Sequence, residues 1–184
     1  FVERYALEAL AARAFVLGFD SKFGRDRRGT PELLARLGYD VEVVREVLVG
    51  GRAVSSTAIR EAVELGDLEG ARRMLGRPVG VLGTVVAGDG RGRTLGFPTA
   101  NLNLHHELHP PLGVYAGWAR VFRRESPVES GEHRAVVNIG LRPTVAREAP
   151  PEPVFEIHLL DFEGDLYGAN VEFRFRARLR GEDR

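Results

Sequence analysis

The feature that most constrains the fold is a change in hydrophobic pattern near residue 79. Up to that point, short apolar runs alternate with amphipathic helical patterns, as in a parallel sheet with helices packed on it. Beyond it, short segments of alternating polarity follow one another between Gly, Pro and Asp clusters, with no helical pattern between them. Such a series is typical of a compact antiparallel barrel. We therefore expect an α/β part over residues 1–78 and a β-barrel over residues 79–184.

Local signals place the elements of the α/β part. Thr30 followed by Pro31 predicts a helix start, because a hydroxyl can cap the first turn and proline is tolerated at the first helical position. Ser55 and Asp67 are expected to cap two further helices in the same way. The remaining expected elements are a helix over 3–13 and buried strands over 14–18 and 41–44.

Five segments of the second part alternate apolar and polar residues or form short β-branched runs, which predicts strands. None is separated from the next by a helical pattern, so the strands are expected to pair antiparallel. The expected strands cover 81–86, 113–122, 134–139, 154–160 and 169–175.

Composition excludes several function classes. The chain has no cysteine, which rules out disulfides and thiolate zinc sites and favours a cytoplasmic protein. A formal net charge of +0 argues against a general nucleic-acid binder. No apolar run approaches the ~20 residues of a membrane span, so no membrane partner is expected. Because the chain starts within a predicted helix and without Met, we interpret it as part of a longer protein; its oligomeric state is left open.

A glycine- and arginine-rich loop ending at Asn101 is the first candidate site. Glycines such as Gly88 and Gly96 let backbone N–H groups approach an anion closely. Thr99 and Asn101 are two residues apart, so in an extended segment both point to the same side, where they offer the oxygen ligands that Mg²⁺ accepts. The segment therefore indicates a nucleotide–Mg²⁺ site. A glycine-rich hairpin loop closed by Pro98 remains an equal alternative.

Glu156 is the candidate catalytic base. Alternation over the strand that contains it places Glu156 and His158 on the face opposite the apolar residues. Phosphoryl transfer from ATP to an alcohol needs a metal, phosphate donors and a carboxylate that takes the hydroxyl proton. The alternative is that both side chains merely form the solvated face of an antiparallel strand.

A cluster of hydroxyls at the predicted helix start of residue 55 is a further candidate. Ser55, Ser56 and Thr57, followed by Arg60, could bind phosphate through the helix N-terminus. Ordinary capping of the helix is the competing explanation.

Together these segments resemble the bifunctional bacterial riboflavin kinase/FMN adenylyltransferases, the FAD synthetase family. The resemblance covers essentially the whole chain and depends on the order and spacing of several motifs. These are Val-Ser-Ser-Thr-Ala-Ile-Arg (54–60), Leu-Gly-Arg-Pro (75–78), Gly-Phe-Pro-Thr-Ala-Asn (96–101), Gly-Val-Tyr-Ala (113–116), Asn-Ile-Gly-Leu-Arg-Pro-Thr-Val (138–145), Glu-Ile-His-Leu-Leu-Asp-Phe (156–162) and Asp-Leu-Tyr-Gly (165–168).

The resemblance implies a six-stranded riboflavin kinase barrel over 79–184, preceded over 1–78 by the C-terminal part of a Rossmann-like nucleotidyltransferase. Thr99 and Asn101 would hold Mg²⁺ and the ATP phosphates under a flap formed by residues 88–96. Glu156 would take the proton of the terminal ribityl hydroxyl of riboflavin, giving FMN and ADP.

By the same resemblance, the hydroxyls at residues 55–57 and Arg60 would bind ATP phosphates for the transfer of AMP to FMN, giving FAD in the intact protein. Three departures limit this expectation: the first nucleotidyltransferase motif is absent, Ser21 stands where relatives carry an aromatic residue, and the chain ends before the C-terminal helix of relatives. A barrel that binds flavin or nucleotide without turnover is the alternative function.

Overall fold

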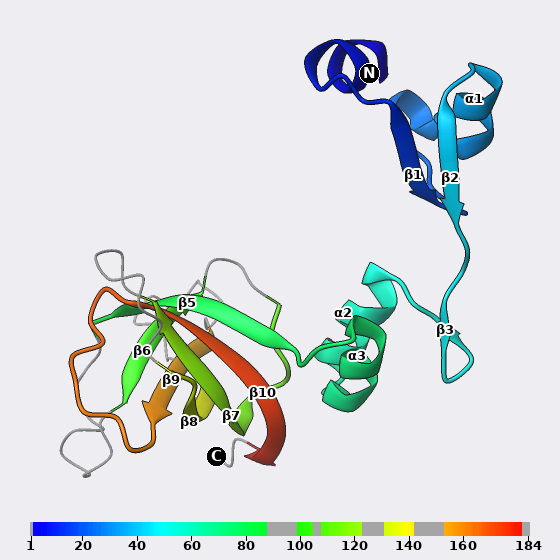
Figure 1. Cartoon of the computed structure of the whole chain (residues 1–184). Helices are drawn as coiled ribbons and strands as arrows, with labels where there is room; N and C mark the ends of the chain where they lie inside the picture. The colour runs from blue at the N-terminus through cyan, green and yellow to red at the C-terminus, as the bar shows by residue number, and fades with distance from the viewer. Residues whose placement is uncertain (1, 88–98, 105–107, 123–130, 142–152, 182–184) are drawn as a thin grey trace, which may run out of the picture. The chain divides into compact units, whose positions relative to one another are not determined.

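The computed structural model describes residues 2–87, 99–104, 108–122, 131–141 and 153–181. The chain divides into two compact units, Phe1–Val54 and Ser55–Arg184. Each is described by itself below, with the element labels of Figure 1. Among the described residues, no helix is long and apolar enough to cross a membrane.

The first unit contains a strand–helix–strand arrangement. Strands β1 (Ala14–Gly18) and β2 (Asp40–Val44) pair in parallel, with helix α1 (Pro31–Arg36) between them in sequence. The helix starts where the sequence predicts, because the Thr30 hydroxyl accepts a hydrogen bond of 3.2 Å from the Leu33 N–H. Parallel pairing with a helical crossover confirms the α/β class of this part. A short 3₁₀ helix, η2 (Arg25–Arg27), precedes α1.

Two details of the first unit differ from the sequence expectation. The first helix is a π-helix, η1 (Val2–Ala9), and it ends before Arg13, because the backbone leaves helical geometry at Ala11, where φ is 48°. A small hairpin of β3 (Leu48–Val49) and β4 (Arg52–Ala53) is also present. Its turn consists of Gly50 and Gly51, both with positive φ, the geometry that favours glycine in two-residue hairpins.

The second unit begins with two short helices whose caps match the sequence prediction. Helix α2 (Ser56–Glu64) is capped by the Ser55 hydroxyl, which accepts a 3.1 Å hydrogen bond from the Ala58 N–H. Helix α3 (Leu68–Leu75) is capped by Asp67, whose carboxylate accepts from the Gly70 N–H at 2.8 Å. Each cap satisfies a backbone donor that the first helical turn leaves without a partner.

A closed antiparallel barrel follows, with the strand order β10-β5-β6-β9-β8-β7 (Figure 1). Its six strands confirm the predicted barrel class. One of them, β6, was not expected as a strand from the sequence. The strands are β5 (Gly80–Val86), β6 (Ala100–Leu104), β7 (Gly113–Phe122), β8 (His133–Leu141), β9 (Pro153–Leu159) and β10 (Asn170–Gly181).

Side chains fill the barrel interior. Alternate residues of each strand point inward, and the most deeply buried include Tyr115, Val137 and Ile157, each 0 % exposed. The Tyr115 hydroxyl donates a 2.5 Å hydrogen bond to the Pro111 carbonyl. Burial raises the pKa of the Tyr115 phenol above its usual value, an effect that the nearby Arg178 guanidinium partly offsets.

The two helices and the barrel share one hydrophobic core. Ala62 and Val63 of α2 and Ala71 of α3 belong to the same buried cluster as the barrel interior. The compact units thus divide at residues 54 and 55, upstream of the boundary at 78 and 79 that the sequence pattern suggests. The 78/79 boundary between the two modules stays a prediction.

Candidate functional site

A polar row crosses three neighbouring barrel strands. Glu156 on β9 lies directly opposite Asn101 of β6 on one side and Asn138 of β8 on the other. Side chains paired in this way have Cβ atoms about 4.5–5.5 Å apart. The two amide-bearing residues therefore flank Glu156, one on each side.

The row lies on the outer surface of the barrel. The residues on either side of Glu156 in β9, Phe155 and Ile157, are 2 % and 0 % exposed and belong to the interior. Because successive side chains of a strand point to opposite faces, Glu156 points outward. Its side chain is half-buried, as are those of Asn101 and Asn138. The barrel thus supplies a rigid backbone on which outward polar groups keep a fixed spacing.

Thr99 extends this polar patch along the strand direction. It directly precedes β6, whose pairing with β9 ends at Ala100 and Ile157, and the same register continued by one residue would set Thr99 opposite His158. Asn101 lies beside Glu156 on the outer face, and Thr99 is two residues from Asn101 in the same segment. The pairing of β6 with β9 thus sets Asn101 beside Glu156, and the roles of these residues stay a prediction.

Asn101 has an unsatisfied polar atom. Its side-chain oxygen Oδ1 is buried, and it has no hydrogen-bond partner within the part of the chain that the structure describes. A buried acceptor without a partner costs about 1–3 kcal/mol, so such an atom is often one that a ligand completes. An amide oxygen, the Thr99 hydroxyl and a nearby carboxylate form a set of hard oxygen donors, which fits Mg²⁺.

A pocket adjoins the patch at the end of β9. It has a volume of about 640 Å³ and begins at His158, which lies two residues from Glu156 on the same face. Asp161, one of its lining residues, accepts a hydrogen bond of 2.7 Å from the guanidinium of Arg134. The pocket is therefore a candidate binding space at this end of β9. It is lined by His158, Leu159, Asp161, Phe162 and Glu163.

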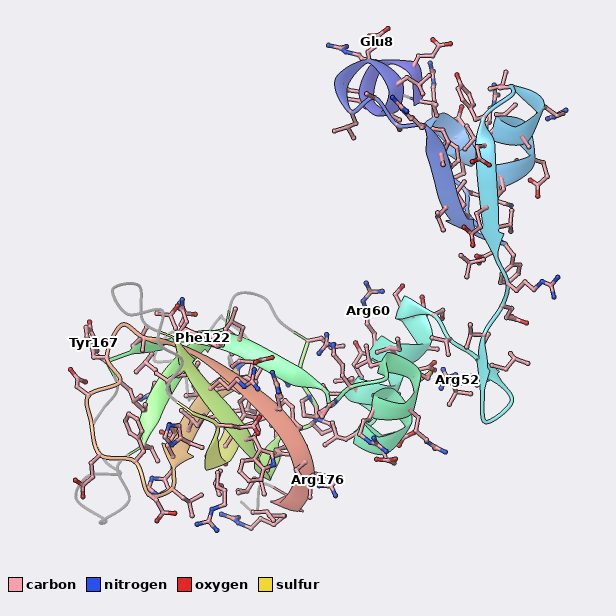
Figure 2. All side chains as sticks on the ribbon, in the orientation of Figure 1. Glu8, Arg52, Arg60, Phe122, Tyr167 and Arg176 are labelled. Atoms are coloured by element: carbon pink, nitrogen blue, oxygen red, sulfur yellow. The ribbon has the colours of Figure 1, made fainter. Side chains whose placement is uncertain are left out.

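The hydroxyl cluster at the start of α2 is a separate feature. Ser55, Ser56, Thr57 and Arg60 are exposed, and they lie on a helix outside the barrel strands. Arg60 extends away from the ribbon (Figure 2). The Ser55 hydroxyl already caps the helix, which is the structural alternative that the sequence left open. It can still donate its proton to a bound anion, so the cap and a phosphate contact are compatible.

Three predicted site residues, Gly88, Gly96 and Pro98, lie outside the described residues. In the described ranges there is no group of three or more His, Asp or Glu side chains that could form a metal site of its own. The oxygen donors of Thr99 and Asn101 therefore remain the candidate for a metal held together with a phosphate ligand.

Ser21 lies in the wall of a second pocket, in the first unit. This pocket has a volume of about 490 Å³ and mixes apolar side chains with Lys22 and Arg27. Ser21 is the position where an aromatic residue was expected from the sequence resemblance. Because the serine side chain has no ring, this position does not give the pocket wall the apolar surface that an aromatic residue would provide.

A family model described as riboflavin kinase matches residues 75–184. This chain belongs to the riboflavin kinase family. A second model, described as FAD synthetase, matches residues 1–58. The two matches fall in the order expected for the bifunctional family that the sequence resembles.

Curated relatives agree with this assignment. A bifunctional riboflavin kinase/FMN adenylyltransferase of Haemophilus influenzae is 38 % identical over 99 % of this chain, and one of Bacillus subtilis is 36 % identical over 99 %. The chain spans 58 % and 56 % of the lengths of these two relatives. A crystal structure from Streptococcus pneumoniae, described as a macrolide-efflux protein, aligns with a TM-score of 0.78 and 33 % identity, covering 100 % of this chain and 57 % of that one.

Sequence reasoning assigned no role to Asn138, which the structure places directly beside Glu156. Asn138 appeared only as the first residue of a family motif. Asn138 can be recognised only from the register of β8 against β9, because Asn138 and Glu156 are on different strands and become neighbours only through strand pairing.

Proposed function

We propose that this chain transfers the γ-phosphoryl group of ATP to the terminal ribityl hydroxyl of riboflavin, forming FMN and ADP. The observation that carries the proposal is the pairing of Asn101 with Glu156, which sets a candidate metal ligand beside a candidate base on one outer face. Membership of the riboflavin kinase family supplies the substrate class.

The proposed mechanism assigns one task to each side chain. Glu156 accepts the proton of the ribityl hydroxyl as that oxygen attacks the γ-phosphorus, and the bond from this phosphorus to the bridging oxygen of ADP breaks. Thr99 and Asn101 would hold Mg²⁺, which supplies charge neutralisation for the phosphates. The pocket that begins at His158 would hold part of one substrate beside the carboxylate.

The intact protein is proposed to add a second step, the transfer of AMP from ATP to FMN to give FAD. Support comes from the family model that matches residues 1–58 and from the relatives that carry both activities. Ser56, Thr57 and Arg60 are the exposed groups proposed to bind ATP phosphates in that reaction, together with Ser55.

The test is an incubation with riboflavin and Mg-ATP, followed by chromatographic separation of the flavins. FMN is expected from this chain, and FAD only from a version that has the length of the curated relatives. Absence of FMN from both versions would contradict the kinase assignment and favour a barrel that only binds flavin.

Glu156→Gln separates catalysis from binding. The substitution keeps the shape of the side chain but removes the base, so turnover should fall by roughly 10²–10⁴-fold while flavin binding is largely retained. Glu172→Gln is the matched control, because Glu172 is also a half-buried glutamate on the barrel exterior and its partner is Arg174. Equal loss of binding and turnover in Glu156→Gln would contradict the role of Glu156 as base.

A further inference from the structure

We propose that Asn138 is a positioning residue that orients the Glu156 carboxylate for proton transfer. This inference rests on the proposed function, because it concerns the same carboxylate. It gives a role to the second of the two amides that flank Glu156, to which neither the sequence analysis nor the proposed metal site assigned one.

The first argument is the placement of Asn138. It pairs directly with Glu156 across β8 and β9, on the side opposite Asn101. Its backbone is held firmly, since the adjacent Val137 and Ile139 are both 0 % exposed in the barrel core. An outward side chain on such a backbone has little freedom in where its polar group can go.

The second argument is the apolar surrounding of the Asn138 amide. Its neighbours along the same face of β8 are Val136 and Gly140, and its partner across β7 is Val114. The two valine side chains cannot form a hydrogen bond, and the glycine has no side chain. Among the described strand neighbours of Asn138 on this face, Glu156 is therefore the one directly opposite that has a polar side chain.

The third argument is chemical complementarity. An ionised carboxylate only accepts hydrogen bonds, and a side-chain amide offers two N–H donors. One hydrogen bond from the Asn138 amide to one carboxylate oxygen would leave the other oxygen free to receive the ribityl proton. It would also restrict the rotation of a flexible glutamate, which keeps the base within reach of the hydroxyl.

The test compares kcat and KM for riboflavin in the 184-residue chain and in Asn138→Ala. Loss of a hydrogen bond to a charged group should lower kcat by about 10- to 100-fold with little change in KM. Asn138→Ser keeps a donor and should recover most of the kcat. The matched control is Asn103→Ala, an exposed asparagine on the outer face of β6 whose partner is Thr84.

A double-mutant cycle decides whether Asn138 acts through Glu156. In the Glu156→Gln background the carboxylate is gone, so adding Asn138→Ala should lower the residual turnover by less than about threefold. Thermal unfolding of each variant is measured to check that it folds. If Asn138→Ala does not fold, Asn138→Ser and Asn138→Asp replace it in the cycle.

Three outcomes would overturn the inference. One is a full additional loss in the Glu156→Gln background, which would mean that Asn138 acts on the substrate itself. Another is a raised KM with unchanged kcat, and a third is full activity of Asn138→Ala. Retained turnover in Glu156→Gln alone would instead contradict the proposed role of Glu156, so the two failures are distinguishable.

Discussion

Asn101 of β6 and Glu156 of β9 face each other across a barrel strand pair, and the Asn101 oxygen is buried without a partner in the described part of the chain. A polar atom in this condition destabilises the ligand-free protein. It is kept at a cost that a bound ligand can offset, because the ligand supplies the missing interaction.

Asn101→Val should therefore stabilise the ligand-free protein and abolish turnover. Removing the unsatisfied oxygen is expected to add about 1 kcal/mol, which for a chain of this size raises the thermal midpoint by roughly 2–4 °C. Thermal unfolding and FMN formation are the two measurements. Asn103→Val is the control, since Asn103 is exposed on the same face of β6. A lower midpoint in Asn101→Val would show that the fold itself uses the amide.

Ser55→Ala should destabilise the second unit through its helix cap. The Ser55 hydroxyl satisfies the Ala58 N–H at 3.1 Å, and loss of such a cap costs about 1 kcal/mol. Ser56→Ala, one residue further along the helix, should leave the free energy of unfolding within about 0.5 kcal/mol of the parent. Chemical denaturation measures both. Equal effects of the two variants would contradict the cap assignment.

Tyr115 should make stability depend on alkaline pH. Burial raises the pKa of its phenol in the folded state, so the folded chain holds the proton more tightly than the unfolded chain does. Its contribution is fully present below the unfolded pKa of about 10 and is lost as the pH rises from there through the folded pKa.

Tyr115→Phe tests this dependence. The variant should lose about 1 kcal/mol near neutral pH, because its hydrogen bond to the Pro111 carbonyl is gone. It should also show a weaker decline in the free energy of unfolding above pH 10. Denaturation midpoints at neutral and alkaline pH give the comparison, and an unchanged alkaline decline would contradict the assignment.

Removal of residues 1–54 should leave a folded protein, whereas removal of residues 1–78 should not leave an equally stable one. The longer deletion removes Val63 and the two alanines that complete the barrel core. Burial of one valine side chain alone contributes about 1.5–3 kcal/mol. The denaturation midpoints of the pieces 55–184 and 79–184 provide the measurement, and equal midpoints would show that α2 and α3 add nothing to the core.

The sequence predicted those parts of the fold that depend on neighbouring residues. The helix caps at Thr30, Ser55 and Asp67 are confirmed, because each cap involves a side chain and an N–H only three residues away. Five of the barrel strands were recognisable from their alternation. The sixth, β6, reads Ala-Asn-Leu-Asn-Leu; it also alternates, but it is short and two of its five residues are asparagine, a residue uncommon in strands.

The candidate site was predictable in its residue types but not in its arrangement. Thr99 and Asn101 could be placed on one side of an extended segment from their spacing alone. Their approach to Glu156 depends on the pairing of β6 with β9, which joins segments more than 50 residues apart. Long-range register is set by the whole barrel, and no local pattern encodes it.

The alternation of inward and outward residues around Glu156 in β9 separates two kinds of change. Inward residues such as Phe155 and Ile157 fill the interior, whereas Glu156 between them points to the outer face, where the proposed substrate would bind. A library that varies only the outward positions of β6, β8 and β9 would therefore sample new substrate preferences while the packing that keeps the protein folded stays constant. Evolution of the barrel along this route needs no compensating change in its core.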